Sequence, residues 1–180
     1  MRIRMSATVA MLALLATGCG TLRADKDVEL SSGSTHTAQE LCEFPTRFFA
    51  TQLELDNLRS EVLHAGSKDK SQAIGFTKVC GYFTADSSHI GDIMLGYSAP
   101  ASAPTTSQSL PNRTLTIDGV TVFEFPRPVL SPAGPSGSAP VELVAEIDGW
   151  EGRFYFPGGD EPAIQAAARM LLDMIKSLRG

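Results

Sequence analysis

Residues 141–156 read VELVAEIDGWEGRFYF, two runs of alternating apolar residues on either side of Asp148-Gly149. An Asp-Gly pair between alternating runs is typical of a β-hairpin with a two-residue turn, because both turn residues need a positive φ. Such a turn pairs Ile147 with Trp150, Ala145 with Gly152, Leu143 with Phe154 and Val141 with Phe156. This apolar face should meet the core. The opposite face should meet solvent and carries Glu142, Glu146, Glu151, Arg153 and Tyr155.

The same turn signal occurs earlier, where Asp118-Gly119 separates residues 115–117 from residues 120–125. This hairpin should direct Leu115, Ile117, Val120 and Val122 to the core. Its other face holds threonines together with Phe123 and Phe125. Two explanations remain open for these aromatic residues. A Pro-rich loop or the N-terminal helix covers them, or they form an exposed apolar patch that contacts an envelope lipid or a protein partner.

Further patterns complete the predicted fold. Residues 74–83 and 93–98 are rich in aromatic and β-branched residues or alternate as strands do. Pro45 suits the first turn of a short helix that ends near Leu53, and Asp160 is suited to cap a C-terminal helix with one apolar stripe. We therefore expect an α+β fold: a mostly antiparallel sheet of five to seven strands, the C-terminal helix on one face and a short N-terminal helix. An all-β barrel is the alternative.

The N-terminus resembles an export signal. Arg2 and Arg4 precede an uncharged apolar run, and small residues follow before Cys19. The sequence LATGC at residues 15–19 resembles a bacterial lipobox, which implies cleavage after Gly18 and acylation of Cys19. A plain signal peptide followed by an incidental cysteine is the alternative. We expect a signal peptide at 1–18, a lipidated cysteine and flexible tether at 19–37, and a single domain at 38–180.

The net charge of the chain limits the kinds of partner that it can bind. The net charge is −5, and removal of residues 1–18 with their two arginines lowers it to −7. An acidic domain is not suited to nucleic acid, and it is repelled by anionic lipid headgroups. The acyl chains on Cys19 should therefore provide the attachment to the membrane, at the outer face of the cytoplasmic membrane.

Two cysteines remain after Cys19. In an oxidising compartment Cys42 and Cys80 should form a disulfide, or else they are two free buried thiols. A zinc site is disfavoured because the three histidines are scattered along the sequence.

The sequence carries no recognised motif of a catalytic, metal or cofactor site. One local cluster has reactive side chains, but it lies in a turn-like stretch and is best explained as a polar loop: Asp86, Ser87, Ser88, His89 and Asp92. Trp150 is expected in the core. We therefore predict no enzyme activity and no cofactor.

In the order of its sequence features, the chain resembles the small two-cysteine lipoproteins of uncharacterised function from mycobacteria and related actinobacteria. The features that carry the resemblance are the lipobox, a polar segment, Leu41-Cys42, the strand VCGYF at 79–83, the IDGV turn and the C-terminal helix. It implies a disulfide between Cys42 and Cys80 and an envelope location, and it implies no known reaction. We expect a binding or scaffolding protein. The alternatives are a phage- or plasmid-type exclusion lipoprotein and an envelope enzyme with an unrecognised site.

Overall fold

The computed structural model describes residues 33–63, 68–97, 110–127 and 139–180. The hairpin that the sequence indicates most strongly lies inside the sheet as β8 (Val141–Ile147) and β9 (Trp150–Phe156). Its register is the predicted one, from Ile147 opposite Trp150 to Val141 opposite Phe156.

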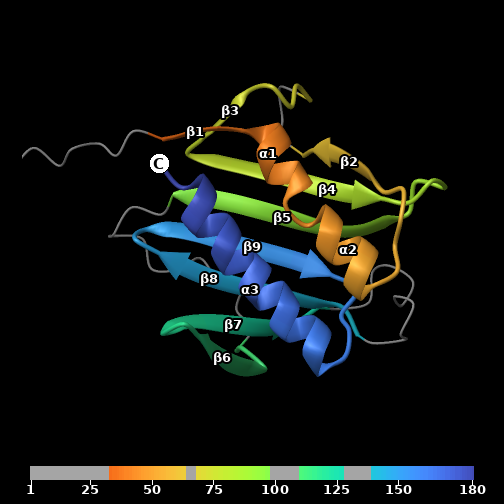
Figure 1. Ribbon diagram of the computed structural model, residues 1–180, viewed down its shortest axis with the longest axis vertical. Helices are drawn as coiled ribbons and strands as arrows, with labels where there is room; N and C mark the ends of the chain where they lie inside the picture. The colour runs from red at the N-terminus through yellow and green to blue at the C-terminus, as the bar shows by residue number, and fades with distance from the viewer. Residues whose placement is uncertain (1–32, 64–67, 98–109, 128–138) are drawn as a thin grey trace, which may run out of the picture. The chain divides into compact units, whose positions relative to one another are not determined.

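The remaining strands extend this hairpin into a seven-stranded antiparallel sheet with the order β2-β4-β5-β9-β8-β7-β6 (Figure 1). These strands are β2 (Arg59–Val62), β4 (Thr77–Phe83), β5 (His89–Tyr97), β6 (Arg113–Ile117) and β7 (Val120–Pro126). The second Asp-Gly hairpin also has its predicted register, with Ile117 opposite Val120. A separate pair of strands is formed by β1 (Ser34–Thr37) and β3 (Ala73–Gly75).

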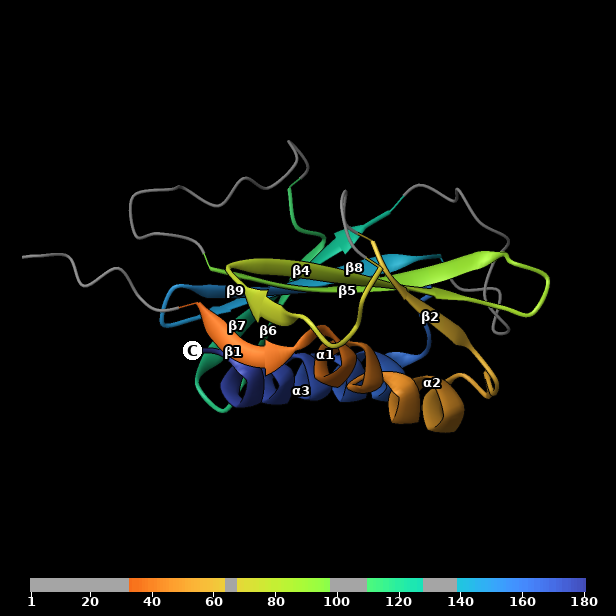
Figure 2. The same cartoon turned by 90° about the horizontal axis from the view of Figure 1, so that it is seen from above.

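Three helices lie on one face of the seven-stranded sheet (Figure 2). They are α1 (Ala38–Glu43), α2 (Thr46–Gln52) and α3 (Glu161–Leu178). The predicted cap of α3 is present, because the Asp160 side chain accepts a hydrogen bond of 3.0 Å from the Ala163 N–H. The predicted apolar stripe of α3 is buried: Ile164, Ala167, Ala168, Leu171, Ile175 and Leu178. The α+β prediction is thus confirmed. Among the described residues, no helix has the length and apolar character that crossing a bilayer requires.

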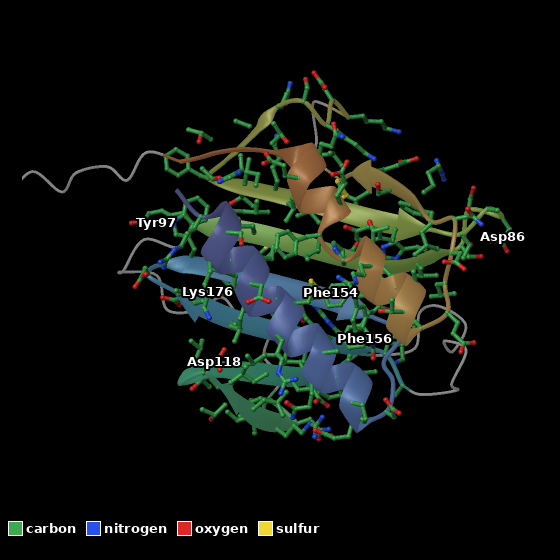
Figure 3. All side chains as sticks on the ribbon, in the orientation of Figure 1. Asp86, Tyr97, Asp118, Phe154, Phe156 and Lys176 are labelled. Carbon is green, nitrogen blue, oxygen red and sulfur yellow. A yellow bond between two sulfur atoms is a disulfide. The ribbon has the colours of Figure 1, made fainter. Side chains whose placement is uncertain are left out.

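Aromatic rings form the centre of the core between α2 and the sheet. Phe48 packs edge-on against Phe154 and Phe156, with ring centroids 5.3 Å apart in both pairs. Phe154 and Phe156 stack on one another at 4.9 Å, and Figure 3 shows both beneath the helices. Trp150 is buried at the other end of β9, as predicted.

Two contacts hold α1 against β4. A disulfide joins Cys42 of α1 to Cys80 of β4. Two residues further along β4, the buried Tyr82 hydroxyl donates a hydrogen bond of 2.9 Å to the Cys42 carbonyl. Burial, and secondarily the negative charge of Asp92, holds the pKa of Tyr82 well above its ordinary value, so this hydroxyl keeps its proton.

The fold begins earlier than the sequence indicates. We expected a tether as far as residue 37, but residues 34–37 form β1. Ser34 is buried, and its hydroxyl donates a hydrogen bond to the carbonyl of Leu178 at the end of α3. This segment is polar, so no apolar alternation marks it as a strand. The predicted signal peptide and Cys19 lie outside the described residues, and so does most of two Pro-rich segments of the sequence, 99–113 and 126–140.

Candidate binding site at the hairpin turns

The candidate site lies on the face of the seven-stranded sheet opposite the helices, which we call the second face. The two Asp-Gly turns are close to the site. Asp118 and Asp148 have φ values of 50° and 51°, and the glycine after each has a φ of 79°. These positive values explain why Asp-Gly is found at both positions. Figure 3 shows Asp118 at the same end of the sheet as Tyr97 and at the opposite end from Asp86.

An open groove of about 440 Å³ lies between the two turns. Its walls come from β7, from the end of β8 and from the turns: Gly119, Val120, Thr121, Phe123, Glu146, Ile147 and Asp148. Phe123 is the only aromatic residue among them, and 40% of its surface is exposed. A large apolar side chain in an open groove offers apolar surface that a partner would remove from water.

The structure separates the two aromatic residues of the predicted patch. Phe123 and Phe125 lie on the second face with ring centroids 6.5 Å apart. Phe125 is only 6% exposed and does not line the groove, so of the two explanations left open the exposed patch does not hold for Phe125. Phe125 lies opposite Glu142 on the next strand, whereas Phe123 lies opposite the smaller Val144. Strand alternation predicts on which face of the sheet each ring lies, but it does not predict which side chains lie next to the ring.

The charge around Phe123 is negative. Glu146 is exposed and lies directly opposite Glu151 across the β8–β9 pair. Glu151 is bound by Arg153 at 2.6 Å, and Asp148 pairs with Arg179. Within the described part of the chain, neither Glu146 nor Asp118 has an ion-pair partner. The groove therefore has uncompensated carboxylates beside its apolar wall.

The rest of the second face is less solvated than its residue types indicate. Glu142 and Glu151 were expected in solvent, but both are buried. Arg127 contacts Glu142 at 2.6 Å, and Arg153 bridges Glu142 and Glu151 at 4.0 and 2.6 Å. A buried carboxylate is tolerated where a guanidinium donates to it. The sequence gives only one sign of these ion pairs, namely the strand alternation that places the residues on the same face of the sheet.

An ion-pair cluster lies on the helix side of the sheet, and the sequence patterns do not reveal it. The register of the β6–β7 hairpin sets Glu124 opposite Arg113, and Glu124 is buried. Arg113 contacts Glu124 at 2.5 Å and Glu161, in the first turn of α3, at 2.6 Å. Both carboxylates, Glu124 first, raise the pKa of Arg113. The cluster connects the β6–β7 hairpin to α3 and is structural.

The local cluster near residue 86 divides into two parts. Asp86 belongs to a tight turn in which hydrogen bonds, first from the Thr84 hydroxyl and then from Ser88, lower its pKa. His89 and Asp92 belong to β5 and contact one another at 2.7 Å. In the described ranges, no group of three or more His, Cys, Asp or Glu side chains is arranged to hold a metal ion.

No protein-family model, no curated protein and no solved structure matches this chain. Function is therefore inferred from the residues of the groove and from the N-terminal sequence.

Proposed function

We propose that this protein is a lipid-anchored envelope protein that acts as a binding module and not as an enzyme. The lipobox-like sequence ending at Cys19 supports acylation and attachment to the outer face of the cytoplasmic membrane. The Cys42–Cys80 disulfide is consistent with an exported domain, because disulfides persist in oxidising compartments.

The observation that supports binding is the half-exposed Phe123 in the open groove between the hairpin turns. Aromatic residues on a rigid strand are common anchors of protein interfaces, because they bury a large area at small cost in side-chain entropy. β7 lies between β6 and β8, so its backbone is fixed on both sides. The groove therefore presents Phe123 in a defined position.

The carboxylates indicate the chemistry of the partner. Glu146 lines the groove, and Asp118 directly precedes Gly119 of its wall. Neither carboxylate has an ion-pair partner in the described ranges, so a basic group would gain from lying there. We propose that the groove binds a protein segment with an apolar side chain next to a lysine or arginine. An anionic lipid headgroup would be repelled by the same carboxylates.

Site-specific photo-crosslinking in intact cells tests the groove. A benzophenone amino acid at position 123 should give a discrete crosslinked protein, and Glu146→Lys, which reverses the charge of an exposed side chain in the groove, should remove that product. The same probe at Phe76, which is 55% exposed and does not line the groove, is the matched control. Equal products from both positions, or none from position 123, would contradict the proposal. Phe123→Ser should leave the melting temperature nearly unchanged, because its side chain is half in solvent.

Membrane fractionation with lipid labelling tests the anchor. Cys19→Ala removes the thiol that accepts the lipid, so the protein should lose the label and leave the membrane fraction or stay unprocessed. The disulfide and the fold should be unaffected, because Cys42 and Cys80 form their own bridge. A Cys19→Ala protein that remains labelled and membrane-bound would rule out lipidation at this residue.

A further inference from the structure

The strand β6 forms one edge of the seven-stranded sheet. It pairs with β7 on its inner side, and within the described ranges no strand pairs with it on its outer side (Figure 1). An edge strand presents a row of backbone N–H and C=O groups that can pair with another extended chain. The outer side of β6 is therefore a candidate surface for the addition of a strand.

The register shows which backbone groups of β6 point outward. At the end of β7, the Arg127 N–H donates a hydrogen bond of 3.1 Å to the Pro140 carbonyl. Successive residues of an antiparallel strand alternate in the neighbour to which their backbone groups point, so odd-numbered residues of β7 bond to β8 and even-numbered ones bond to β6. The residues of β6 opposite the even-numbered positions are Arg113, Leu115 and Ile117. The backbone N–H and C=O groups of Thr114 and Thr116 consequently point away from the sheet.

β6 lacks the features that protect the other edge of the sheet. The strand at that edge, β2, has only four residues and carries the ion pair Arg59–Glu61. A short length and charged side chains hinder pairing at an edge. Residues 114–117, by contrast, read TLTI, which contains no charge, glycine or proline and favours extended structure. The single charge of β6, on Arg113, is already bound by two carboxylates.

The sequence of β6 is complementary to itself. When two copies of the strand lie antiparallel with their Leu115 residues opposite one another, Thr114 of each copy lies opposite Thr116 of the other. The outward N–H and C=O groups of these threonines then form four hydrogen bonds, as hydrogen-bonded pairs of an antiparallel ladder do. Threonines that face one another across strands add a favourable side-chain contact. The two Arg113 side chains lie at opposite ends of the five-residue overlap, so like charges do not meet.

The side chains of β6 suit the same arrangement. Thr114 and Thr116 are exposed on the second face, whereas Leu115 and Ile117 lie on the helix side and are 8% and 7% exposed. The two Leu115 residues form a pair without hydrogen bonds, in which side chains approach most closely, so each covers the apolar surface that the other still exposes.

We propose that β6 is the interface of a two-fold symmetric homodimer whose two sheets join edge to edge through this strand. Residues that lie opposite one another across strands share a face of the sheet. The helices of both copies therefore lie on one side of the joined sheet, and both grooves lie on the other. The interface contains neither Phe123 nor the acylated cysteine, so it is independent of the groove and of the anchor.

Disulfide trapping tests the register. Single cysteines are placed in the full Cys19→Ala chain, in which the other two cysteines are bridged, and the copies carry tags of two sizes. Thr114→Cys mixed with Thr116→Cys should give a mixed disulfide on oxidation, because the Cα atoms of a hydrogen-bonded pair lie about 5.5 Å apart. Two copies of the same variant should react more slowly, because their diagonal separation of about 7–8 Å is at or beyond the reach of a disulfide. Thr77→Cys, which changes an exposed threonine of β4, is the control.

Sedimentation of the same full chain over a range of concentrations measures the dimer itself. Thr116→Pro removes an outward N–H from each copy without a loss of bonds to β7, and Thr116→Lys places a charge at the interface. Either change should raise the dissociation constant of the dimer about tenfold or more, since the proline variant loses two hydrogen bonds. Thr77→Lys, the matched charge control on β4, and Phe123→Ser, the groove variant, should leave the dissociation constant unchanged.

Three results would overturn the proposal. The first is a chain that stays monomeric at every concentration. The second is a disulfide between copies of one variant, or at Thr77→Cys, that forms as fast as the mixed one. The third is a dimer that neither Thr116→Pro nor Thr116→Lys weakens.

Discussion

Glu40 shows how one exposed side chain sets the start of a helix. Its carboxylate accepts a hydrogen bond of 2.6 Å from the Thr37 N–H, while the Thr37 hydroxyl accepts from the Glu40 N–H at 3.3 Å. This reciprocal arrangement satisfies backbone donors that have no partner in the first turn of α1. The bond from the Thr37 N–H is the largest cause that lowers the pKa of Glu40 from 4.5 to about 2, and a hydrogen bond from His36 adds to it.

The depressed pKa gives the capping contribution a defined dependence on pH. A carboxylate whose pKa is lower in the folded state stabilises the fold above its unfolded value, and the contribution is lost as pH falls toward the folded value. We predict that the contribution of Glu40 to the free energy of unfolding is complete above about pH 4.5 and is lost as the pH falls toward 2. Thermal unfolding measured across this range should show a shallower pH dependence for Glu40→Gln, which does not titrate. An unchanged slope in this variant would contradict the assignment.

Between elements, α3 approaches β9 closely at Gly152. A Cβ atom at this position would lie 2.6 Å from Cγ1 and 2.7 Å from Cδ1 of Ile175, and 3.0 Å from Cδ1 of Leu171. These distances are shorter than side chains tolerate, so the absence of a side chain at residue 152 allows α3 to pack directly on the strand. Gly152 is therefore required by the helix above it and not by its own backbone angles.

Adding one methyl group at Gly152 should therefore overpack this contact. We predict that Gly152→Ala lowers the free energy of unfolding by about 1–3 kcal/mol, measured by urea denaturation. Ile175→Ala alone should cost about 2–5 kcal/mol because it leaves a cavity. The double variant should lose less than the sum of the two, because the new methyl group occupies part of the vacated space. Additive losses would show that the two side chains do not compete for the same volume.

The elements differ in how far the sequence specifies them. The two Asp-Gly hairpins and α3 are predicted in register or face because turn chemistry and apolar periodicity agree there. β1 is not predicted, because Ser34, Thr35, His36 and Thr37 form a strand through pairing with β3 and a hydrogen bond to the end of α3. β2 also lacks a clear alternating pattern, and its pairing with β4 is what makes it a strand. Only contacts distant in sequence specify these two strands.

The residues of the candidate site also differ in how far the sequence predicts their positions. Alternation places Phe123 and Phe125 on one face, and the first of them lines the groove. That Phe125 is buried, that Arg127 and Arg153 hold Glu142, and that His89 reaches the second face all depend on neighbours across strands or on a register shift. Sequence patterns therefore identify the groove residue but not the side chains that surround it.

For the molecule as a whole, the disulfide is the main covalent constraint. Cys42 and Cys80 are 38 residues apart, and the loop between them includes α2, β2 and β3. Closing a loop of this length restricts the unfolded chain and stabilises the fold by about 4 kcal/mol in the loop-entropy model. This is a large part of the 5–15 kcal/mol typical of a domain.

We predict that the double variant Cys42→Ala with Cys80→Ala loses about 3–4 kcal/mol of unfolding free energy. Urea denaturation of the variant should match that of the unchanged protein under reducing conditions, which serves as the control. Thiol titration of denatured, unreduced Cys19→Ala protein should find no free thiol. Two titratable thiols, or equal stability of the variant and the oxidised protein, would contradict a structural role for the bridge.

The same bridge determines how the domain transmits mechanical force. When tension is applied between residue 33 and any residue beyond Cys80, it passes from Cys42 to Cys80 through the sulfur atoms and bypasses the loop between them. An extended chain spans about 3.3–3.6 Å per residue, so the 38-residue separation withholds about 130 Å of chain from stretching. A domain pulled away from a surface to which its N-terminal end is fixed would therefore lengthen by that much less when it unfolds.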